Sequence, residues 1–123
     1  YVKRYKEEDY LKYLQESKYG IILDAHESQG FAIEEALSCD VPLLVWNVTS
    51  MNQEEGINYP DIPATSIPYW DNRCGESFYN KEEFEEKYNE FTSKLDTYKP
   101  REFVLDKLGI DKCANNFKKL IDL

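Results

Sequence analysis

The clearest fold signal in the chain is Tyr19–Val48, YGIILDAHESQGFAIEEALSCDVPLLVWNV. Its first segment, Tyr19–Leu23, is short and continuously apolar, which is typical of a strand buried on both faces of a parallel sheet. The turn HESQG then leads into a predicted helix over residues 31–39. A second apolar strand, Leu43–Val48, follows directly. This order of strand, turn, helix and strand predicts a βαβ unit with a right-handed crossover. We expect four side chains of the helix to point inward: Phe31, Ala32, Ala36 and Leu37.

The flanking segments predict a small α/β domain around this unit. Residues 7–18 form an amphipathic pattern, with acidic side chains in the first turn. The apolar stripe of this helix is Tyr10, Leu11 and Leu14. Residues 49–63 form a polar loop. Residues 64–69 predict a third strand at a sheet edge, because Pro68 cannot donate to a strand ladder.

Helices are predicted for the rest of the chain. Asn80 and Glu83 have the spacing of a capping box at the start of a helix over residues 81–95. Pro100 suits the first position of the next helix, and Gly109 suits the position just after its end.

The last predicted helix is capped by Asp111, and its inward side chains are expected to be Phe117, Leu120 and Ile121. The fold class is therefore α/β, with a Rossmann-like parallel sheet flanked by helices. Three parallel strands make a thin sheet with an exposed edge. Because the chain also begins at Tyr1 without an initiator Met, we expect residues 1–123 to be part of a larger domain.

The composition excludes several classes of function. The 123 residues carry 15 Lys and Arg against 24 Asp and Glu, which gives a formal net charge of −9. Proteins that bind phosphate backbones need a basic surface, so we expect binding of neither nucleic acid nor anionic membranes. Aromatic residues make up 15% of the chain, which argues for a packed core instead of disorder.

Cysteine and histidine counts bear on the compartment and on metals. Three cysteines at long spacings form no disulfide framework, and we expect reduced thiols in a cytoplasmic protein. One histidine, His26, argues against a zinc site. No apolar run approaches the roughly 20 residues that a membrane span needs. We interpret the sequon at Asn47 as a chance match, because the chain has eight Asn and Asn47 ends a predicted buried strand.

The turn after the first strand carries the candidate site. In open α/β sheets, ligands bind beyond the carboxyl ends of strands and against helix N-termini. Gly30 lets a ligand approach the backbone, and unpaired amides at the helix start favour a phosphate. Glu27 precedes the helix and Glu35 follows eight positions later. Carboxylates accept hydrogen bonds from sugar hydroxyls, so this pattern predicts a site for a nucleotide sugar. We expect Glu34 to point into solvent.

The same residues resemble a known motif, E-G-F-G-L-x-x-x-E-A-M-A-C-G-x-P-V-V. It belongs to the retaining glycosyltransferases of the GT-B fold, the family-4-like group. Glu27 and Glu35 keep the E-x7-E spacing, and four further positions also match: Gly30, Ala36, Cys39 and Pro42. Ser28-Gln29 departs from the usual Gly-Phe, and Asp40 stands where the family has Gly.

The resemblance implies a role for each matching residue. Glu27 would contact the transferred sugar, and Glu35 would hold the ribose. The amides that would meet the donor belong to Gln29, Gly30, Phe31 and Ala32. The family uses neither metal nor cofactor, takes a nucleoside-diphosphate sugar as its donor substrate and retains the anomeric configuration. The C-terminal segment, residues 101–121, is similar to the family's closing helices. The resemblance is tight over residues 19–48 and covers the later half of the donor-binding domain, so the acceptor-binding N-terminal domain would be a missing partner.

Other functions and residues stay open at this stage. A non-catalytic interaction module with the same fold is the main alternative, and a sugar-nucleotide epimerase is a third possibility. Exposed sheet surface suggests self-association. His26 and Asp24 are weaker candidates for the pocket, and we expect Cys39 to be a core residue. The cluster Tyr69–Gly75 either packs aromatic side chains at a strand end or forms a wall of the nucleotide pocket, with Arg73 near phosphate or a partner domain.

Overall fold

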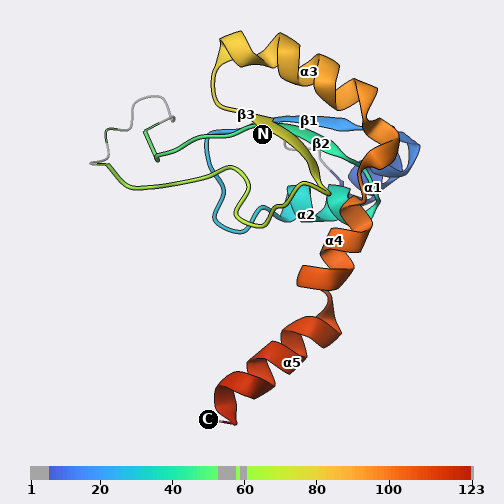
Figure 1. Cartoon of the computed structure of the whole chain (residues 1–123). Coiled ribbons are helices and arrows are strands. Elements are labelled where there is room, and N and C mark those ends of the chain that lie inside the picture. The colour runs from blue at the N-terminus through green and yellow to red at the C-terminus, as the bar shows by residue number, and fades with distance from the viewer. Residues whose placement is uncertain (1–5, 53–57, 59–60, 123) are drawn as a thin grey trace.

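The computed structural model of the chain describes residues 6–52, 58 and 61–122, and has an α/β fold (Figure 1). Its sheet contains three parallel strands in the order β1-β2-β3: Gly20–Leu23, Leu43–Trp46 and Gly75–Phe78. The register pairs Gly20 with Leu43, and Leu43 with Gly75. Helix α2, Phe31–Ser38, connects β1 to β2. The βαβ unit and the α/β fold class predicted from the sequence are therefore confirmed.

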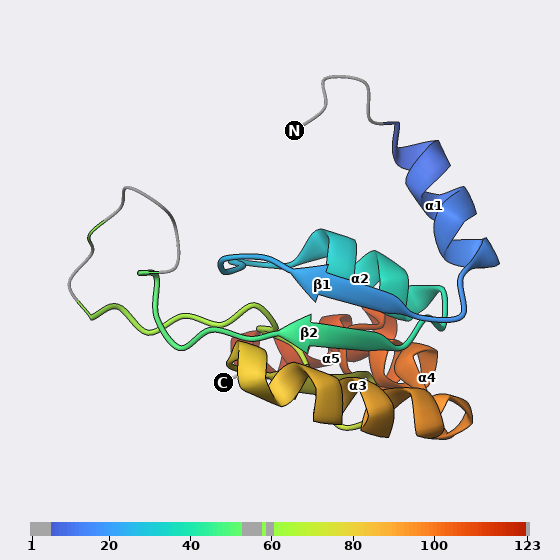
Figure 2. The same ribbon diagram turned by 90° about the horizontal axis from the view of Figure 1, so that it is seen from above.

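Helices cover the two faces of the sheet unequally. On one face lie α2, α1 (Glu7–Glu16) and α4 (Pro100–Lys107), packed around a core that includes Ile33, Leu37, Val45 and Phe103. On the opposite face lies α3, Phe84–Ser93, over β2 and β3 (Figures 1 and 2). The second core holds Leu44, Phe78, Phe91 and Tyr98. The sheet is thus the middle layer of three.

Strand β1 is not buried on both faces, so that prediction is wrong for one face. Ile21 is 40% exposed and Leu23 is 70% exposed, whereas Leu43, Leu44 and Val45 of β2 are buried. The cause is the position of β1 at the end of the strand order, because α3 packs mainly over β2 and β3.

The third strand is Gly75–Phe78 and not residues 64–69. Gly75 has a φ of +140°, and a Cβ atom there would stand 1.9 Å from the carbonyl oxygen of Leu43. Only glycine allows this close approach, so the strand begins where the sequence indicated a loop. Residues 64–69 instead form an irregular segment, in which the Ser66 amide donates to the Asn47 side chain and the Ile67 amide to the Thr65 hydroxyl.

The inward face of α2 is shifted from the prediction. Ala36 and Leu37 are buried as expected, but Phe31 is 70% exposed and Ala32 is exposed. Ile33 is buried in their place. The reason is the helical period: Ile33, Ala36 and Leu37 are spaced i, i+3 and i+4 and share one face, whereas Phe31 points to another side of the helix. In α1, Leu14 is buried, whereas Leu11 is 47% exposed.

The predicted cap at Asn80 is confirmed, but the return bond of the capping box goes to the amide of Tyr79 and not to that of Asn80. The Asn80 side chain accepts a hydrogen bond from the Glu83 amide at 3.3 Å, and the Glu83 carboxylate accepts one from the Tyr79 amide at 3.0 Å. A 3₁₀ turn at Lys81–Glu83 precedes α3, and a second one at Leu95–Thr97 follows it. The predicted helix over 81–95 is therefore divided at its start and shorter at its end.

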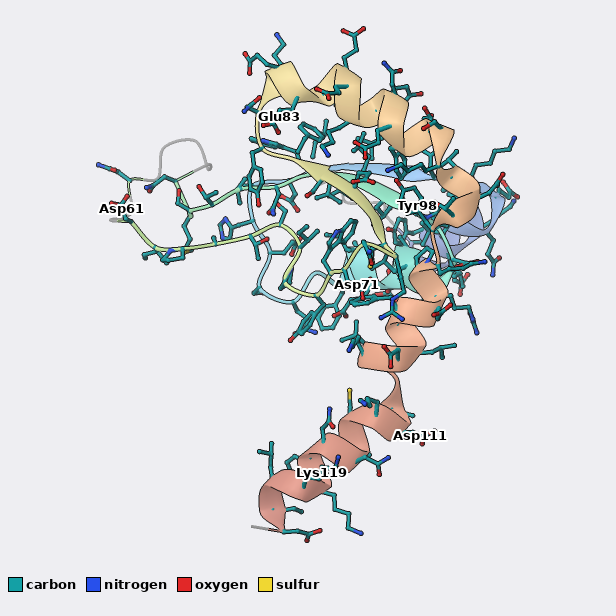
Figure 3. The ribbon with its side chains drawn as sticks, in the orientation of Figure 1. Asp61, Asp71, Glu83, Tyr98, Asp111 and Lys119 are labelled. Atoms are coloured by element: carbon teal, nitrogen blue, oxygen red, sulfur yellow. The ribbon has the colours of Figure 1, made fainter. Side chains whose placement is uncertain are left out.

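Helix α4 begins at Pro100, as predicted, and ends at Lys107, two residues before Gly109. Helix α5, Ile110–Ile121, begins before Asp111, so Asp111 is not its cap. The predicted inward side chains of α5 are exposed, by 64% to 67%: Phe117, Leu120 and Ile121. Figures 1 and 3 show α5 extending away from the sheet, with Asp111 and Lys119 along it. Across the described ranges, no helix combines the length and apolar character of a membrane span.

Candidate functional site

The turn between β1 and α2 lies at the carboxyl edge of the sheet and holds Gly30 in a left-handed conformation. Its φ is +79° and its ψ is +46°, and it occupies the N-cap position of α2. An added Cβ atom would be 3.8 Å from Glu27 Cβ and from Pro68 Cδ, which is ordinary contact. Glycine is therefore favoured here by its backbone conformation and not by lack of space.

The N-terminus of α2 has no side-chain cap. Gly30 provides none, and the first backbone acceptor of the helix is its carbonyl oxygen, which receives the Glu34 amide at 2.9 Å. The amides of the first turn have no acceptor within the helix, and the helix dipole gives this end about half a positive charge. Phe31 and Ala32 are exposed, so this helix start lies at the surface of the protein.

Glu27 is half-buried beside this helix start. Its backbone amide donates to the carbonyl oxygen of Thr65 at 3.0 Å. Partial burial raises the pKa of the Glu27 carboxyl, and the neighbouring Asp24 carboxyl raises that pKa further, while His26 opposes the shift. Glu27 is thus a carboxyl group that keeps its proton to a higher pH than an ordinary glutamate does.

Gln29 and Glu34 are linked across the start of α2. The Gln29 Nε2 donates to Glu34 Oε1 at 2.9 Å, and both side chains are half-buried. The prediction that Glu34 points into solvent is therefore wrong. This bond orients the Gln29 amide toward the helix and leaves its carbonyl oxygen as an acceptor.

Glu35 lies on a different side of α2. Its side chain is exposed and lines a hollow of about 290 Å³ between α1 and α2, together with Glu7, Glu8, Tyr10 and two leucines. The structure therefore brings Glu27, Gln29 and Gly30 together at the turn, while Glu35 faces α1.

The sequence interpretation missed a polar group below the turn. Asn47 follows β2 directly and is only 8% exposed. Its Oδ1 accepts hydrogen bonds from Thr65 Oγ1 at 2.8 Å and from the Ser66 amide at 3.0 Å. A polar residue directly after an apolar strand, at the ligand-binding edge of an α/β sheet, was the signal that could have identified it. Its burial supports the interpretation of the sequon as a chance match.

A larger hollow opens at the carboxyl edge on the opposite face of the sheet. It measures about 610 Å³ and is lined by residues from all three strand ends and from α3. Its apolar and aromatic members are Leu23, Trp46, Phe78, Tyr79 and Phe84. The candidate turn is on the α2 face, so this hollow is separate from it.

The cluster around Arg73 has a structural role in this fold. The guanidinium contacts Asp71 at 2.8 Å and Asp106 at 3.1 Å, and lies 5.5 Å from the centroid of the Phe103 ring. These contacts join α4 to the segment before β3, and Figure 3 shows Asp71 beside α4. The adjacent Cys74 is fully buried, and burial raises its pKa to about 12. The packing interpretation of this cluster is the one that the geometry supports.

The fold and this turn define an α/β domain in which an uncapped helix start lies close to the half-buried Glu27. Among the described residues, no group of three or more His, Cys, Asp or Glu side chains is arranged to hold a metal ion. Comparisons with protein-family models, with curated proteins and with solved structures gave no match to this chain.

Proposed function

We propose that this chain binds a nucleoside-diphosphate sugar at the turn between β1 and α2, as the donor-binding part of a retaining glycosyltransferase. The observation that carries the proposal is the position of Gly30. This residue starts an uncapped helix in a left-handed conformation, and a Cβ atom added to it would be 3.8 Å from the Cβ atom of Glu27. The E-x7-E motif supports the same assignment, because its first glutamate and its glycine meet at this turn.

The electrostatics favour a diphosphate at the helix start. The chain carries a net charge of −9, so it has no long-range attraction for phosphate. The amides of Phe31 and Ala32 and the dipole of α2 would supply local attraction, worth about 0.3–1 kcal/mol at an exposed helix end. The same field would stabilise the diphosphate as it leaves the sugar during transfer.

The carboxylates would hold the neutral parts of the donor. Ionised Glu27 would accept hydrogen bonds from hydroxyls of the transferred sugar, and Glu35 would accept them from the ribose. Because Glu35 faces α1, the nucleoside would extend along α2 toward that helix. The acceptor and the remaining phosphate contacts would come from outside these elements, as the GT-B resemblance implies.

Ligand-observed NMR with UDP-, GDP- and ADP-sugars tests the proposal. One nucleotide class should bind, and Glu27→Ala and Glu35→Ala should each weaken binding by about 1–3 kcal/mol, because each removes a charged hydrogen-bond acceptor. In the intact enzyme the same variants should reduce transfer. Unchanged transfer in both variants would contradict the proposal.

A non-catalytic interaction module is the second candidate. Its supporting observation is the apolar surface that the described residues leave uncovered, on α5 and on the outer face of β1. Absence of nucleotide-sugar binding by the intact protein, together with capture of a partner through Phe117 and Leu120, would favour this function.

A further inference from the structure

Asn47, directly after β2, is hydrogen-bonded to Thr65 and Ser66 in the segment between β2 and β3. Its carboxamide oxygen accepts three hydrogen bonds: from the Val48 amide at 2.9 Å, from Thr65 Oγ1 at 2.8 Å and from the Ser66 amide at 3.0 Å. The backbone amide of Asn47 donates to the carbonyl oxygen of Phe78 at 2.7 Å. A buried side chain with this many partners fixes the backbone around it.

Thr65 continues the connection to the candidate site. Its hydroxyl donates to Asn47 and accepts the Ile67 amide at 3.1 Å, so its backbone is held on both sides. Its carbonyl oxygen then accepts the Glu27 amide at 3.0 Å. Glu27 belongs to no helix or strand, so this bond determines where its backbone lies at the edge of the sheet.

We propose that Asn47 is a positioning residue for Glu27. It holds Thr65, and Thr65 holds the backbone from which the Glu27 side chain reaches the sugar. The nature of the ligand rests on the proposed function, whereas the connection from Asn47 to Glu27 rests on the hydrogen bonds. Asn47 has one further contact that leads elsewhere, from Nδ2 to the Tyr79 hydroxyl at 3.4 Å, and this contact supplies the control.

The test breaks the connection at its middle residue. Thr65→Val keeps the shape of the side chain and removes the hydroxyl, and Thr65→Ser restores the hydroxyl. Tyr79→Phe is the matched control, because it also removes one hydrogen bond of Asn47 but leaves Thr65 untouched. Three quantities are measured in each variant by NMR: amide hydrogen exchange at Glu27, the carbon-13 titration of its carboxyl group, and the affinity for the nucleotide sugar.

We expect Thr65→Val to accelerate amide exchange at Glu27 on the order of tenfold, and to move the carboxyl titration toward that of an ordinary glutamate. Donor affinity should fall several-fold. Thr65→Ser should restore all three values, and Tyr79→Phe should match the original chain. Protection of the Leu44 and Val45 amides in β2 reports that the fold itself is intact.

Unchanged exchange at Glu27 in Thr65→Val, with β2 still protected, would overturn the proposal. Faster exchange with unaltered donor affinity would also overturn it, because the position of Glu27 would then not matter for binding. If exchange and titration respond as expected but the original chain binds no nucleotide sugar, the connection is supported and the proposed function fails.

Discussion

The backbone amide of Glu27 donates to the carbonyl oxygen of Thr65 at 3.0 Å, and this bond joins the turn after β1 to the segment before β3. The two segments meet because β1, β2 and β3 are parallel, which brings their carboxyl ends to one edge of the sheet. Pro68 lies close to Gly30 at the start of α2, since a Cβ atom added to Gly30 would be 3.8 Å from Pro68 Cδ. The candidate site is therefore made from two loops and one helix N-terminus.

Glu27→Gln should weaken binding of the nucleotide sugar by about 1–3 kcal/mol, because an ionised acceptor of hydroxyl hydrogen bonds becomes a neutral amide. Titration calorimetry of the original and variant chains measures the difference. Glu86→Gln, at an exposed position of α3, is the matched control for the change in charge. Equal losses in both variants would mean that net charge, and not Glu27, controls the affinity.

The stability of the chain should depend on pH through Glu27. The folded-state pKa of Glu27 is raised above its usual value, so the folded state holds this proton more tightly than the unfolded state. The contribution of Glu27 to stability is therefore present below its unfolded-state pKa, and is lost as pH rises through the folded-state pKa. Because glutamine does not ionise, the stability of Glu27→Gln should not fall with pH through this group.

Urea unfolding of both chains at several pH values checks this dependence. The variant should gain stability over the original chain as the pH rises above the usual range for glutamate. A difference that is constant with pH, or that shrinks as pH rises, would contradict the raised pKa.

Gly30→Ala should destabilise the fold by about 1–2 kcal/mol, because alanine is strained at a φ of +79° while its Cβ atom meets no clash. Gly30→Asn should cost less, since asparagine tolerates the left-handed region. The free energy of unfolding, measured with urea, gives the order of the three chains. An alanine variant as stable as the original would show that Gly30 is not left-handed in solution.

Asp40→Ala should also be destabilising, by about 1–2 kcal/mol. Asp40 has a positive φ of 62°, and its carboxylate accepts the Arg101 amide at 3.1 Å at the start of α4. Alanine loses this bond and tolerates the backbone conformation less well. Asp40→Asn keeps an acceptor oxygen and should be close to neutral. If Asp40→Ala and Asp40→Asn both unfold at the same denaturant concentration as the original chain, the contact contributes nothing to stability and the prediction is wrong.

The cysteines should differ in reactivity. Cys113 is exposed on α5, whereas Cys74 is buried with its pKa raised to about 12, so little thiolate forms at neutral pH. Mass spectrometry after brief treatment with a thiol reagent should find Cys113 modified and Cys74 modified only after unfolding. Rapid modification of Cys74 in the folded chain would contradict its burial beneath α4.

The elements that the sequence predicted well have local signals. Strands β1 and β2 are continuous apolar runs, and Asn80 caps the 3₁₀ turn that leads into α3. Strand β3 has no such signal: it reads GESF, and its identity depends on how closely Gly75 approaches the backbone of Leu43. The exposed apolar side chains of α5 show that burial is also hard to predict, because helical spacing predicts an apolar face but not what covers it.

The site likewise contains residues that the local sequence predicts and residues that only the folded structure brings together. Glu27 and Gly30 are neighbours in sequence, so the turn that unites them could be predicted. The contacts of Asn47 with Thr65, and of Thr65 with Glu27, span a long irregular segment and arise only when the strands align. Glu34 was misjudged because its partner, Gln29, lies in the turn before the helix, where spacing within the helix gives no guide.

The most direct measurement is an amide chemical-shift map of this chain, titrated with UDP-, GDP- and ADP-sugars. The proposed function predicts that one of the three nucleotide classes produces the largest shifts at Gly30, Phe31 and Ala32, and that Glu27→Gln reduces them. Shifts centred on Trp46 and Tyr79 at the opposite face, or no shifts with any nucleotide sugar in the intact protein, would contradict it.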